Sequence, residues 1–489
     1  MRKLETLNFD NTYTRLPEIF FERVMPTGFE STHLVSFNPS AAALIDLDPD
    51  EAKRPEFHEA MGGKLLLPGS DPIAMLYAGH QFGHYVSPLG DGRAILLGEV
   101  RNGRGEKWDL HLKGAGMTRF SRDGDGRAVL RSTVREYLCG EAMHGLGIPT
   151  TRSLCLIGSD EAVLRENVET GAMLVRMAPS HVRFGTFEVF FYRRQFEHLK
   201  TLADYVLTWH FPHLGDGPDA YARFLREVAE RTGRLIAQWQ AVGWAHGVMN
   251  TDNMSILGLT LDYGPYGFMD DFSPGFIPNH SDHHGRYSFQ NQPDIGYWNV
   301  RAIAQALSPL VEEAGVLGAP EIYEATMQQT YADLMQAKLG LKEAREGDDK
   351  LRRDLLALMH SNHVDYTNFF RALGTFNQAD PSANGHLRDQ FLDREGFDWW
   401  ADRYRARLKA EHSVDTDRKA GMDACNPKYV LRNYLVQVAI ERAARHRDYS
   451  EIDRLRELLR HPFNDQPEMH EYAAPPPDWG KQIMVSCSS

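Results

Sequence analysis

The chain has 489 residues, of which 42% are hydrophobic and 25% are charged, a composition typical of a globular protein. Its 67 acidic and 54 basic residues give a net charge of −13, which argues against a broad basic surface for nucleic acid or an anionic membrane. No run of about 18 apolar residues predicts a membrane span, and residues 1–20 lack the apolar core of a secretory signal. We therefore expect a cytoplasmic protein with no nucleic-acid or membrane partner.

The cysteine content is low and follows no recognisable framework. The four cysteines have neither zinc-motif nor disulfide spacing; they are Cys139, Cys155, Cys425 and Cys487. A reducing compartment fits this usage.

Residues 1–60 mix short polar and apolar pieces and predict an irregular extension with one helix near 40–46. Residues 61–185 favour strands. Their clearest feature is a hairpin, in which β-prone runs at 93–100 and 106–114 flank an Asn-Gly turn.

Alternation along the second strand of this hairpin places Asp109, His111 and Lys113 on one face. A helix is predicted next, over about 133–145, with Ser132 as its N-cap and apolar residues at four-residue steps. Strands are then expected at 151–158 and 172–178.

The second half of the chain predicts mainly helix. Long helices are expected at 187–208 and 219–242, followed by a short hairpin across Gly258. Residues 186–462 form one helical unit, and 463–489 an extended tail. The predicted fold class is α+β, with a β-rich lobe containing one internal helix, an enlarged helical lobe, and the site between them.

A loop from His246 to Asn253, followed by Asp262 in an Asp-Tyr-Gly sequence, has the order of a protein-kinase catalytic loop. Asn253 and Asp262 match the positions that supply oxygen ligands to Mg²⁺. The usual proton acceptor is replaced by Val248, so the nearest carboxylate able to accept a proton is Asp252. The alternative is that these residues are ordinary turn formers.

Upstream residues favour the nucleotide interpretation. Lys113 on its strand and Glu136 on the following helix match the lysine–glutamate pair that holds phosphates in kinases. The sequence GDGRA occurs at 90–94 and again at 124–128, where glycines permit tight turns whose amides approach a phosphate. A kinase G-x-G-x-x-G is absent, and a single GDGR is usually a surface turn.

Two further arginines, Arg176 and Arg183, lie at and after the end of a predicted strand. Together with Arg93 and Lys113 they can converge on a triphosphate, although surface arginines are the plainer interpretation. The histidine-rich segment 280–288 offers zinc ligands, but a polar loop is the favoured interpretation because no further ligand is identifiable.

The segments LKGAGMTRFSRDGDGRAVLRSTVREYL, VRMAPSHVRFGTFE and HGVMNTDNMSILGLTLDYGPYGFMDDFSPGF together resemble the selenoprotein O family. The similarity continues through NHSDHHGRYSFQNQP and NPKYVLRNYL to Cys487, where eukaryotic members carry selenocysteine. It covers nearly the whole chain.

The resemblance implies a protein-kinase-like two-lobed fold that does not phosphorylate. It implies instead ATP bound in a flipped orientation, transfer of AMP to Ser, Thr or Tyr hydroxyls of proteins, and use of Mg²⁺ or Mn²⁺. Asp252 would be the proton acceptor, Glu136 would orient Lys113, and Asn253 and Asp262 would hold the metal. The ATP-binding residues would be Gly90, Gly92, Arg93, Lys113, Asp125, Gly126, Arg176, Arg183 and Asp262.

The chain departs from some bacterial relatives, in which a cysteine after the Asp262 position pairs with a tail cysteine. Here the matching stretch has Pro278 and no cysteine, so that redox latch is not expected and the role of Cys487 stays open. Three other functions also stay open: an ordinary phosphotransferase, a nucleotide-binding pseudoenzyme, and a zinc hydrolase.

Overall fold

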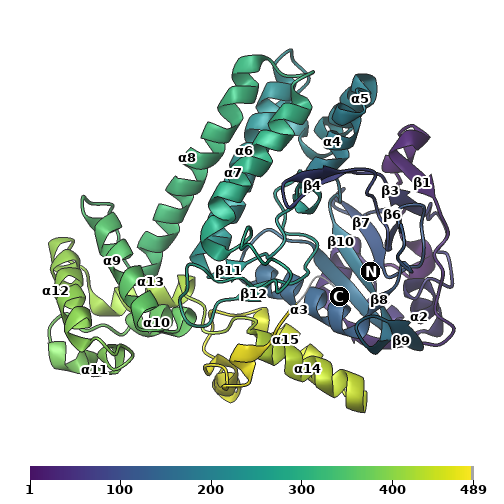
Figure 1. Cartoon of the computed structure of the whole chain (residues 1–489). Helices are drawn as coiled ribbons and strands as arrows, with labels where there is room; N and C mark the ends of the chain where they lie inside the picture. Colours follow the sequence, from purple (N-terminus) through teal and green to yellow (C-terminus); the bar gives the residue numbers. More distant parts are fainter. Residues whose placement is uncertain (486–489) are drawn as a thin grey trace.

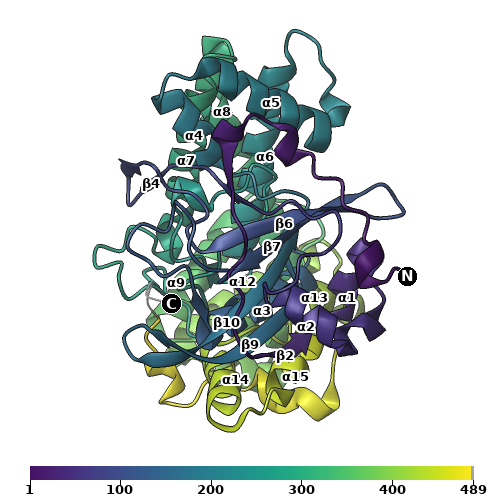
Figure 2. The ribbon, with the colours of Figure 1, turned by 90° about the vertical axis from the view of Figure 1, so that its right-hand side faces the viewer.

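The computed structural model describes residues 1–485 and is built around one antiparallel sheet (Figures 1 and 2). In spatial order the strands are β1 (Phe21–Arg23), β3 (Ile73–Met75), β6 (Ala94–Arg101), β7 (Lys107–Lys113), β10 (Val168–Ala178), β9 (Arg152–Leu164) and β2 (Thr32–Phe37), and β8 (Ala128–Val129) also pairs with β10. The expected hairpin is confirmed as β6 and β7, with Ala94 opposite Lys113.

The sheet separates two hydrophobic cores. On one face, Leu110 and Leu112 of β7 pack under the short helices α1 (Pro39–Ala42) and α2 (Pro55–Met61). On the other face lies α3 (Leu130–Gly145), which packs on β9 and β10. Asp109, His111 and Lys113 all project to this second face, as alternation along β7 predicts, and all three are buried.

The N-terminal 60 residues differ from the expected irregular extension. The helix near 40–46 is present as α1 and a following 3₁₀ turn (Ala43–Ile45), but β1 and β2 also join the two edges of the sheet. β1 has only three residues and the six residues of β2 do not alternate, so pairing with β3 or β9 decides the conformation of each strand.

The predicted N-cap of α3 is wrong. The helix begins at Leu130, after an extended Val129, and Ser132 donates its hydroxyl hydrogen bond back to the Val129 carbonyl at 3.0 Å. A serine inside the first turn can bond a preceding carbonyl instead of capping the next turn.

The helical half contains α4 (Phe184–Tyr192), α5 (Phe196–His210), α6 (Ala220–Ala241), α7 (Gln292–Leu307) and α8 (Glu313–Lys338). Figure 1 shows α6, α7 and α8 side by side as a long bundle. The single helix expected at 187–208 is broken, because Arg194 takes a left-handed φ of 56° between α4 and α5.

The hairpin expected across Gly258 is also wrong. Ser255 instead forms an isolated bridge with Arg183, and Thr260 bridges to Thr150. Both partners lie far away in the sequence, so the local alternation in this segment reflects pairing with other parts of the chain. The short strands β11 (Trp244–Ala245) and β12 (Gly267–Phe268) pair on either side of it.

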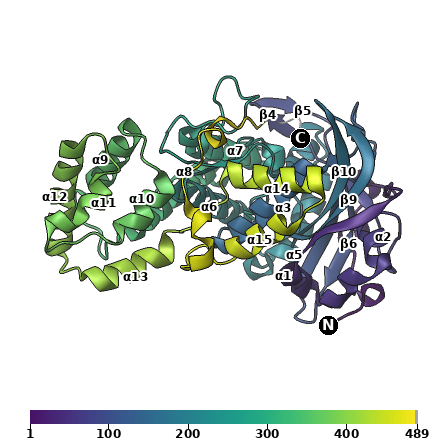
Figure 3. The same ribbon diagram turned by 90° about the horizontal axis from the view of Figure 1, so that it is seen from below.

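Five helices with their own hydrophobic core lie at the end of the bundle far from the sheet (Figures 1 and 3). They are α9 (Asp348–Ser361), α10 (Tyr366–Leu373), α11 (Gly385–Arg388), α12 (Arg394–Ala410) and α13 (Asp415–Cys425). From there the chain returns, and α14 (Asn433–His446) and α15 (Ser450–Leu459) pack on α3.

Arg456 of α15 donates to the Tyr137 hydroxyl of α3 at 3.1 Å. At Gly145, the last residue of α3, a β-carbon would come within 1.9 Å of the Leu459 carbonyl oxygen. The tail beyond 463 contains the 3₁₀ turns Pro467–Ala473 and Gly480–Gln482, where an extended segment was expected, and Cys487 lies outside the described residues.

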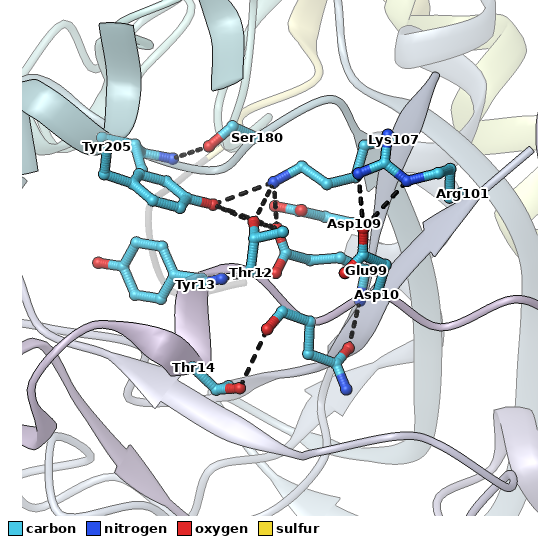
Figure 4. Close-up of polar contacts among 12 residues, drawn as sticks. Asp10, Thr12, Tyr13, Thr14, Glu99, Arg101, Lys107, Asp109, Ser180 and Tyr205 are labelled. Atoms are coloured by element: carbon cyan, nitrogen blue, oxygen red, sulfur yellow. Dashed lines mark hydrogen bonds and ion pairs between the residues drawn. The ribbon is translucent and has the colours of Figure 1, made fainter. Parts of the chain in front are cut away.

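A buried polar cluster joins the N-terminal segment, the sheet and α5 (Figure 4). Lys107 of β7 forms an ion pair with Glu99 of β6 and donates to Thr12 at 2.6 Å and to the Tyr205 hydroxyl at 3.0 Å. Since an unpaired buried charge is costly, these partners fix the N-terminal segment against the sheet.

No helix within residues 1–485 combines the length and apolar character that a bilayer crossing requires.

Candidate active site

A cavity of about 530 Å³ opens between the sheet and the loops that follow α6. On the sheet side, its walls include the glycine turn around Asp91 and the side chains of Lys113 and Arg176. Loop residues 248–253 and 262–265 form the other wall. Of the predicted site residues, the cavity brings together Gly90, Gly92, Arg93, Lys113, Gly126, Arg176, Asp252, Asn253 and Asp262.

Three predicted residues do not line this cavity. Glu136 and Arg183 lie behind it and contact residues that do line it, Lys113 and Arg176 in one case and Asp262 in the other. Asp125 points outward and accepts two hydrogen bonds from the Arg165 guanidinium, at 2.8 and 3.0 Å. Its neighbours Gly124 and Gly126 do line the cavity, so the second GDGR turn reaches it through backbone.

Lys113 and Glu136 form a buried ion pair between β7 and α3. The second carboxylate oxygen of Glu136 accepts from Arg176 at 3.2 Å. Burial alone would raise the pKa of Glu136, but Lys113 and Arg176 hold it below its ordinary value. Glu136 therefore remains ionised and orients both cations.

Asp262 receives ion pairs from Arg176 on one oxygen and from Arg183 on the other. Burial opposes its ionisation, yet the two guanidinium groups hold the pKa of Asp262 well below its usual range. Arg183 also donates to the Asp252 carbonyl at 2.7 Å, and its guanidinium lies 4.4 Å from the centre of the Tyr77 ring. Asp262 thus holds both arginines, Arg176 in the cavity wall and Arg183 behind it.

Asp252 and Asn253 lie on the 3₁₀ turn Thr251–Asn253. Oδ1 of Asp252 is buried and has no hydrogen-bond partner within residues 1–485, while Oδ2 accepts from Gln81 at 3.3 Å. Burial raises the pKa of Asp252 to about 7. A carboxylate in this state suits proton transfer near neutral pH.

The donor set at the cavity fits a hard divalent cation. Asn253 commits its amide nitrogen to the Val248 carbonyl at 2.9 Å, which leaves its side-chain oxygen as the atom that a cation can use. Asp262 adds carboxylate oxygens. The described part of the chain has no group of three His, Cys, Asp or Glu residues that could hold a metal alone, so water or phosphate oxygens would complete the coordination.

The histidine-rich segment 280–288 likewise contains no group of three residues placed to hold a metal. Its contacts agree with the polar-loop interpretation. Its Asp282 accepts from the backbone amides of Arg286 and Tyr287 at 3.0 and 2.8 Å. That carboxylate shapes the loop.

Close contacts with neighbouring residues require glycine at key positions of both GDGR turns. Gly90 has a φ of 136°, and a β-carbon there would lie 2.5 Å from the Phe120 ring. Gly126 has a φ of 69°, and its β-carbon would meet Gly116 at 2.1 Å. The two GDGR turns thus pack against the segment that joins β7 to α3, and their backbones face the cavity.

The family model of "Protein adenylyltransferase SelO" matches residues 3–460. The chain belongs to this family. Proteins named protein nucleotidyltransferase YdiU are 62% identical in Myxococcus xanthus, 56% in Thiobacillus denitrificans and 52% in Pseudomonas fluorescens, each match covering 100% of both chains. The resemblance seen in the sequence is confirmed, and this SelO-family chain is a nucleotidyltransferase.

Four residues that surround Asp252 and its turn gave no signal in the sequence. Glu188 of α4 accepts from His80 at 2.6 Å and from the Thr251 hydroxyl, and Gln81 contacts Asp252. His80 and Gln81 belong to a hairpin of β4 (Gly79–Gln81) and β5 (His84–Val86). These contacts join three segments far apart in the sequence, so no local spacing reveals them.

Proposed function

We propose that this SelO-family protein binds ATP in the 530 Å³ cavity and transfers AMP to Ser, Thr or Tyr hydroxyls of proteins. The observation that carries the proposal is the placement of Lys113, Arg176 and Arg183 beside Asp252 and Asp262. Cations there suit the distal phosphates, and a carboxylate beside them suits the incoming hydroxyl.

The scaffold of the proposal is a kinase-like two-lobed fold. Residues 61–185 would be the N-lobe and 186–462 the C-lobe, with an extension at 1–60 and a tail at 463–489. The sheet backed by α3, with a cavity between it and the loops after α6, supports two lobes on either side of the cavity, although β1 and β2 of the extension also pair with the sheet of the N-lobe.

ATP is proposed to lie flipped, with its distal phosphates toward the sheet. The turn amides near Gly90 and Gly92 would approach phosphate oxygens. Arg93, Lys113, Arg176 and Arg183 would neutralise them, and Asp125 and Gly126 would bound the second turn. This orientation leaves the α-phosphorus toward Asp252.

Asn253 and Asp262 would hold Mg²⁺ or Mn²⁺. When bound, the cation would neutralise charge on the phosphates. Asp262 now satisfies Arg176 and Arg183, so its engagement elsewhere would release both guanidinium groups toward the nucleotide. Asp262 would thus hold Arg176 and Arg183 in place until the nucleotide binds.

In the transfer step, the target hydroxyl oxygen forms a bond to the α-phosphorus, and the bond from that phosphorus to the bridging oxygen breaks. Pyrophosphate leaves with the electron pair, next to Arg176 and Arg183. Asp252 accepts the hydroxyl proton, for which Oδ2 on the Gln81 side is the available oxygen.

The test uses ATP labelled at the α- or at the γ-phosphate, with a divalent cation and a proteome extract. The proposal predicts that protein retains the α label. In the γ experiment the protein should stay unlabelled, because the label leaves with pyrophosphate. Retention of γ label would establish an ordinary phosphotransferase instead. ATP binding without label in either experiment would establish a pseudoenzyme.

A further inference from the structure

His111 is a buried residue to which the proposed reaction assigns no part. The pairing of β7 with β10 places it directly opposite Arg176, with both side chains on the cavity face of the sheet. Nδ1 of His111 lies 3.2 Å from Nε and 2.9 Å from Nη2 of Arg176. On its other side, Nε2 lies 3.0 Å from Oδ2 of Asp91.

These contacts fix the protonation of the ring. A guanidinium can only donate, so Nδ1 must be the unprotonated acceptor. The single proton of the neutral ring is then on Nε2, which donates to the Asp91 carboxylate. Burial, aided by the positive charge of Arg176, lowers the pKa of His111 to about 4, which agrees with a neutral ring.

Asp91 belongs to the first GDGR turn and anchors it to the sheet. It makes two hydrogen bonds to the backbone of Met75: its amide donates to the Met75 carbonyl at 3.0 Å, and its side-chain Oδ2 accepts from the Met75 amide at 3.1 Å. Its own carbonyl accepts from the Thr118 hydroxyl at 2.7 Å. Since the neighbouring glycines line the cavity, His111 connects a fixed part of the phosphate turn to Arg176.

We propose that His111 is a positioning residue that holds Arg176 in the orientation needed for the leaving pyrophosphate. This inference rests on the proposed function. If Asp262 held a cation, its ion pair with Arg176 would be lost, and Nη1 would keep only Glu136 at 3.2 Å. Nε and Nη2 remain on His111, so Nη1 can reach a phosphate while the guanidinium plane stays fixed.

The plainer explanation is that His111 is a core residue with satisfied hydrogen bonds, and the chain contains a matched control for it. His181 stacks on His111 with ring centres 4.4 Å apart, and it is equally buried. It bonds Asp109 through Nδ1 at 2.9 Å, and its Nε2 has no hydrogen-bond partner within the described chain. His181→Phe therefore removes a neighbouring buried imidazole without touching Arg176.

The kinetic test compares His111→Phe, His111→Gln and His181→Phe with the native full chain. We expect His111→Phe to lower kcat for AMP transfer by about 10- to 100-fold, with KM for ATP changed by less than about 3-fold, because Arg176 acts on the leaving group. Glutamine can accept from Arg176 and donate to Asp91, so His111→Gln should recover most of kcat. His181→Phe should stay within about 3-fold of the native rate.

Two measurements do not depend on catalysis. Nitrogen-15 NMR of the native protein should show His111 protonated at Nε2 and unprotonated at Nδ1 at pH 7. Calorimetry with pyrophosphate and Mg²⁺ should show roughly 10-fold weaker binding to His111→Phe than to His181→Phe. If His111→Phe does not fold, the NMR measurement on the native protein still tests the inference, because it reads the proton position of His111 directly.

The outcomes separate this inference from the proposed function. A native protein that transfers no α label contradicts the function, whatever the variants do. A native protein that transfers AMP alongside an equally active, folded His111→Phe overturns the role of His111 alone. Equal losses in His111→Phe, His111→Gln and His181→Phe, or a proton on Nδ1, also overturn it.

Discussion

Gly79 lies directly against the side chain of Asp252. A β-carbon at residue 79 would come within 2.3 Å of Oδ1 and 2.8 Å of the Asp252 β-carbon. Gly79 begins β4, and the next residues of the same hairpin contact Glu188 and Asp252. The hairpin therefore sets the position of the proposed proton acceptor.

Gly79→Ala should displace Asp252 and lower kcat by about 10- to 100-fold, since a misplaced base loses proton transfer, while ATP affinity changes little. Single-turnover transfer of labelled AMP and calorimetry with ATP measure the two effects. Gly275→Ala is the control, because no atom lies within 4 Å of a β-carbon there. Full activity in Gly79→Ala would show that the contact does not position Asp252.

Asp252→Asn keeps the shape of the side chain but cannot accept the proton. We expect transfer to fall by at least about 100-fold, and ATP affinity to stay within about 3-fold of native. The measurement is kcat together with the equilibrium affinity for ATP. Parallel losses in both quantities would indicate that Asp252 acts in nucleotide binding instead.

Asp262→Asn should have opposite effects on catalysis and on binding of a metal-free anion. Transfer should be lost with the carboxylate ligand. Arg176 and Arg183 lose their shared carboxylate at the same time, so pyrophosphate in EDTA should bind about 10-fold more tightly. The control is Asp271→Asn, outside the cavity, whose carboxylate pairs with Lys481 at 2.9 Å. Unchanged or weaker pyrophosphate binding would contradict competition by Asp262.

Lys338, at the end of α8, is buried, and no carboxylate is among the groups that influence it in the described chain. Its ammonium lies 4.4 Å from the centre of the Phe370 ring and 5.2 Å from that of Tyr366. Burial lowers the pKa of Lys338 to about 8. The unfolded chain therefore binds more protons between about pH 8 and 10.4, and the free energy of unfolding should rise with pH across that window.

Lys338→Met should remove this cost and raise the free energy of unfolding at pH 7 by roughly 2 to 3 kcal/mol, less whatever the ring contacts contribute. It should also flatten the rise in stability above pH 8. Urea unfolding at pH 7 and pH 9.5 measures both. Lys350→Met, at an exposed lysine paired with Asp354, should change stability by less than about 0.5 kcal/mol. A lower free energy of unfolding for Lys338→Met than for the native protein would contradict a destabilising charge at Lys338.

Sequence patterns located most of the residues that meet at the cavity because their signals are local. Lys113 stands on an alternating strand, and Asn253 and Asp262 keep a fixed distance along one loop. The same alternation placed His111 on the face of Lys113. It gave no indication of the bond to Arg176, which depends on the register between β7 and β10.

Errors arose where distant segments decide local structure. The edge strands β1 and β2 exist because the sheet supplies partners for them. The contacts of Glu188 with His80 and Thr251 span 108 and 63 residues. No periodicity within a single segment carries that information.

The packing of α15 on α3 affects when the site can fold during synthesis. Every residue that lines the cavity precedes position 266, and Glu136 is also made early. Yet the outer side of its helix is covered by Arg456 and Leu459, which are synthesised after every residue that lines the cavity. We expect a nascent chain without α15 to carry all the side chains of the cavity but no stable site, so that nucleotide transfer requires α15 to be made and docked.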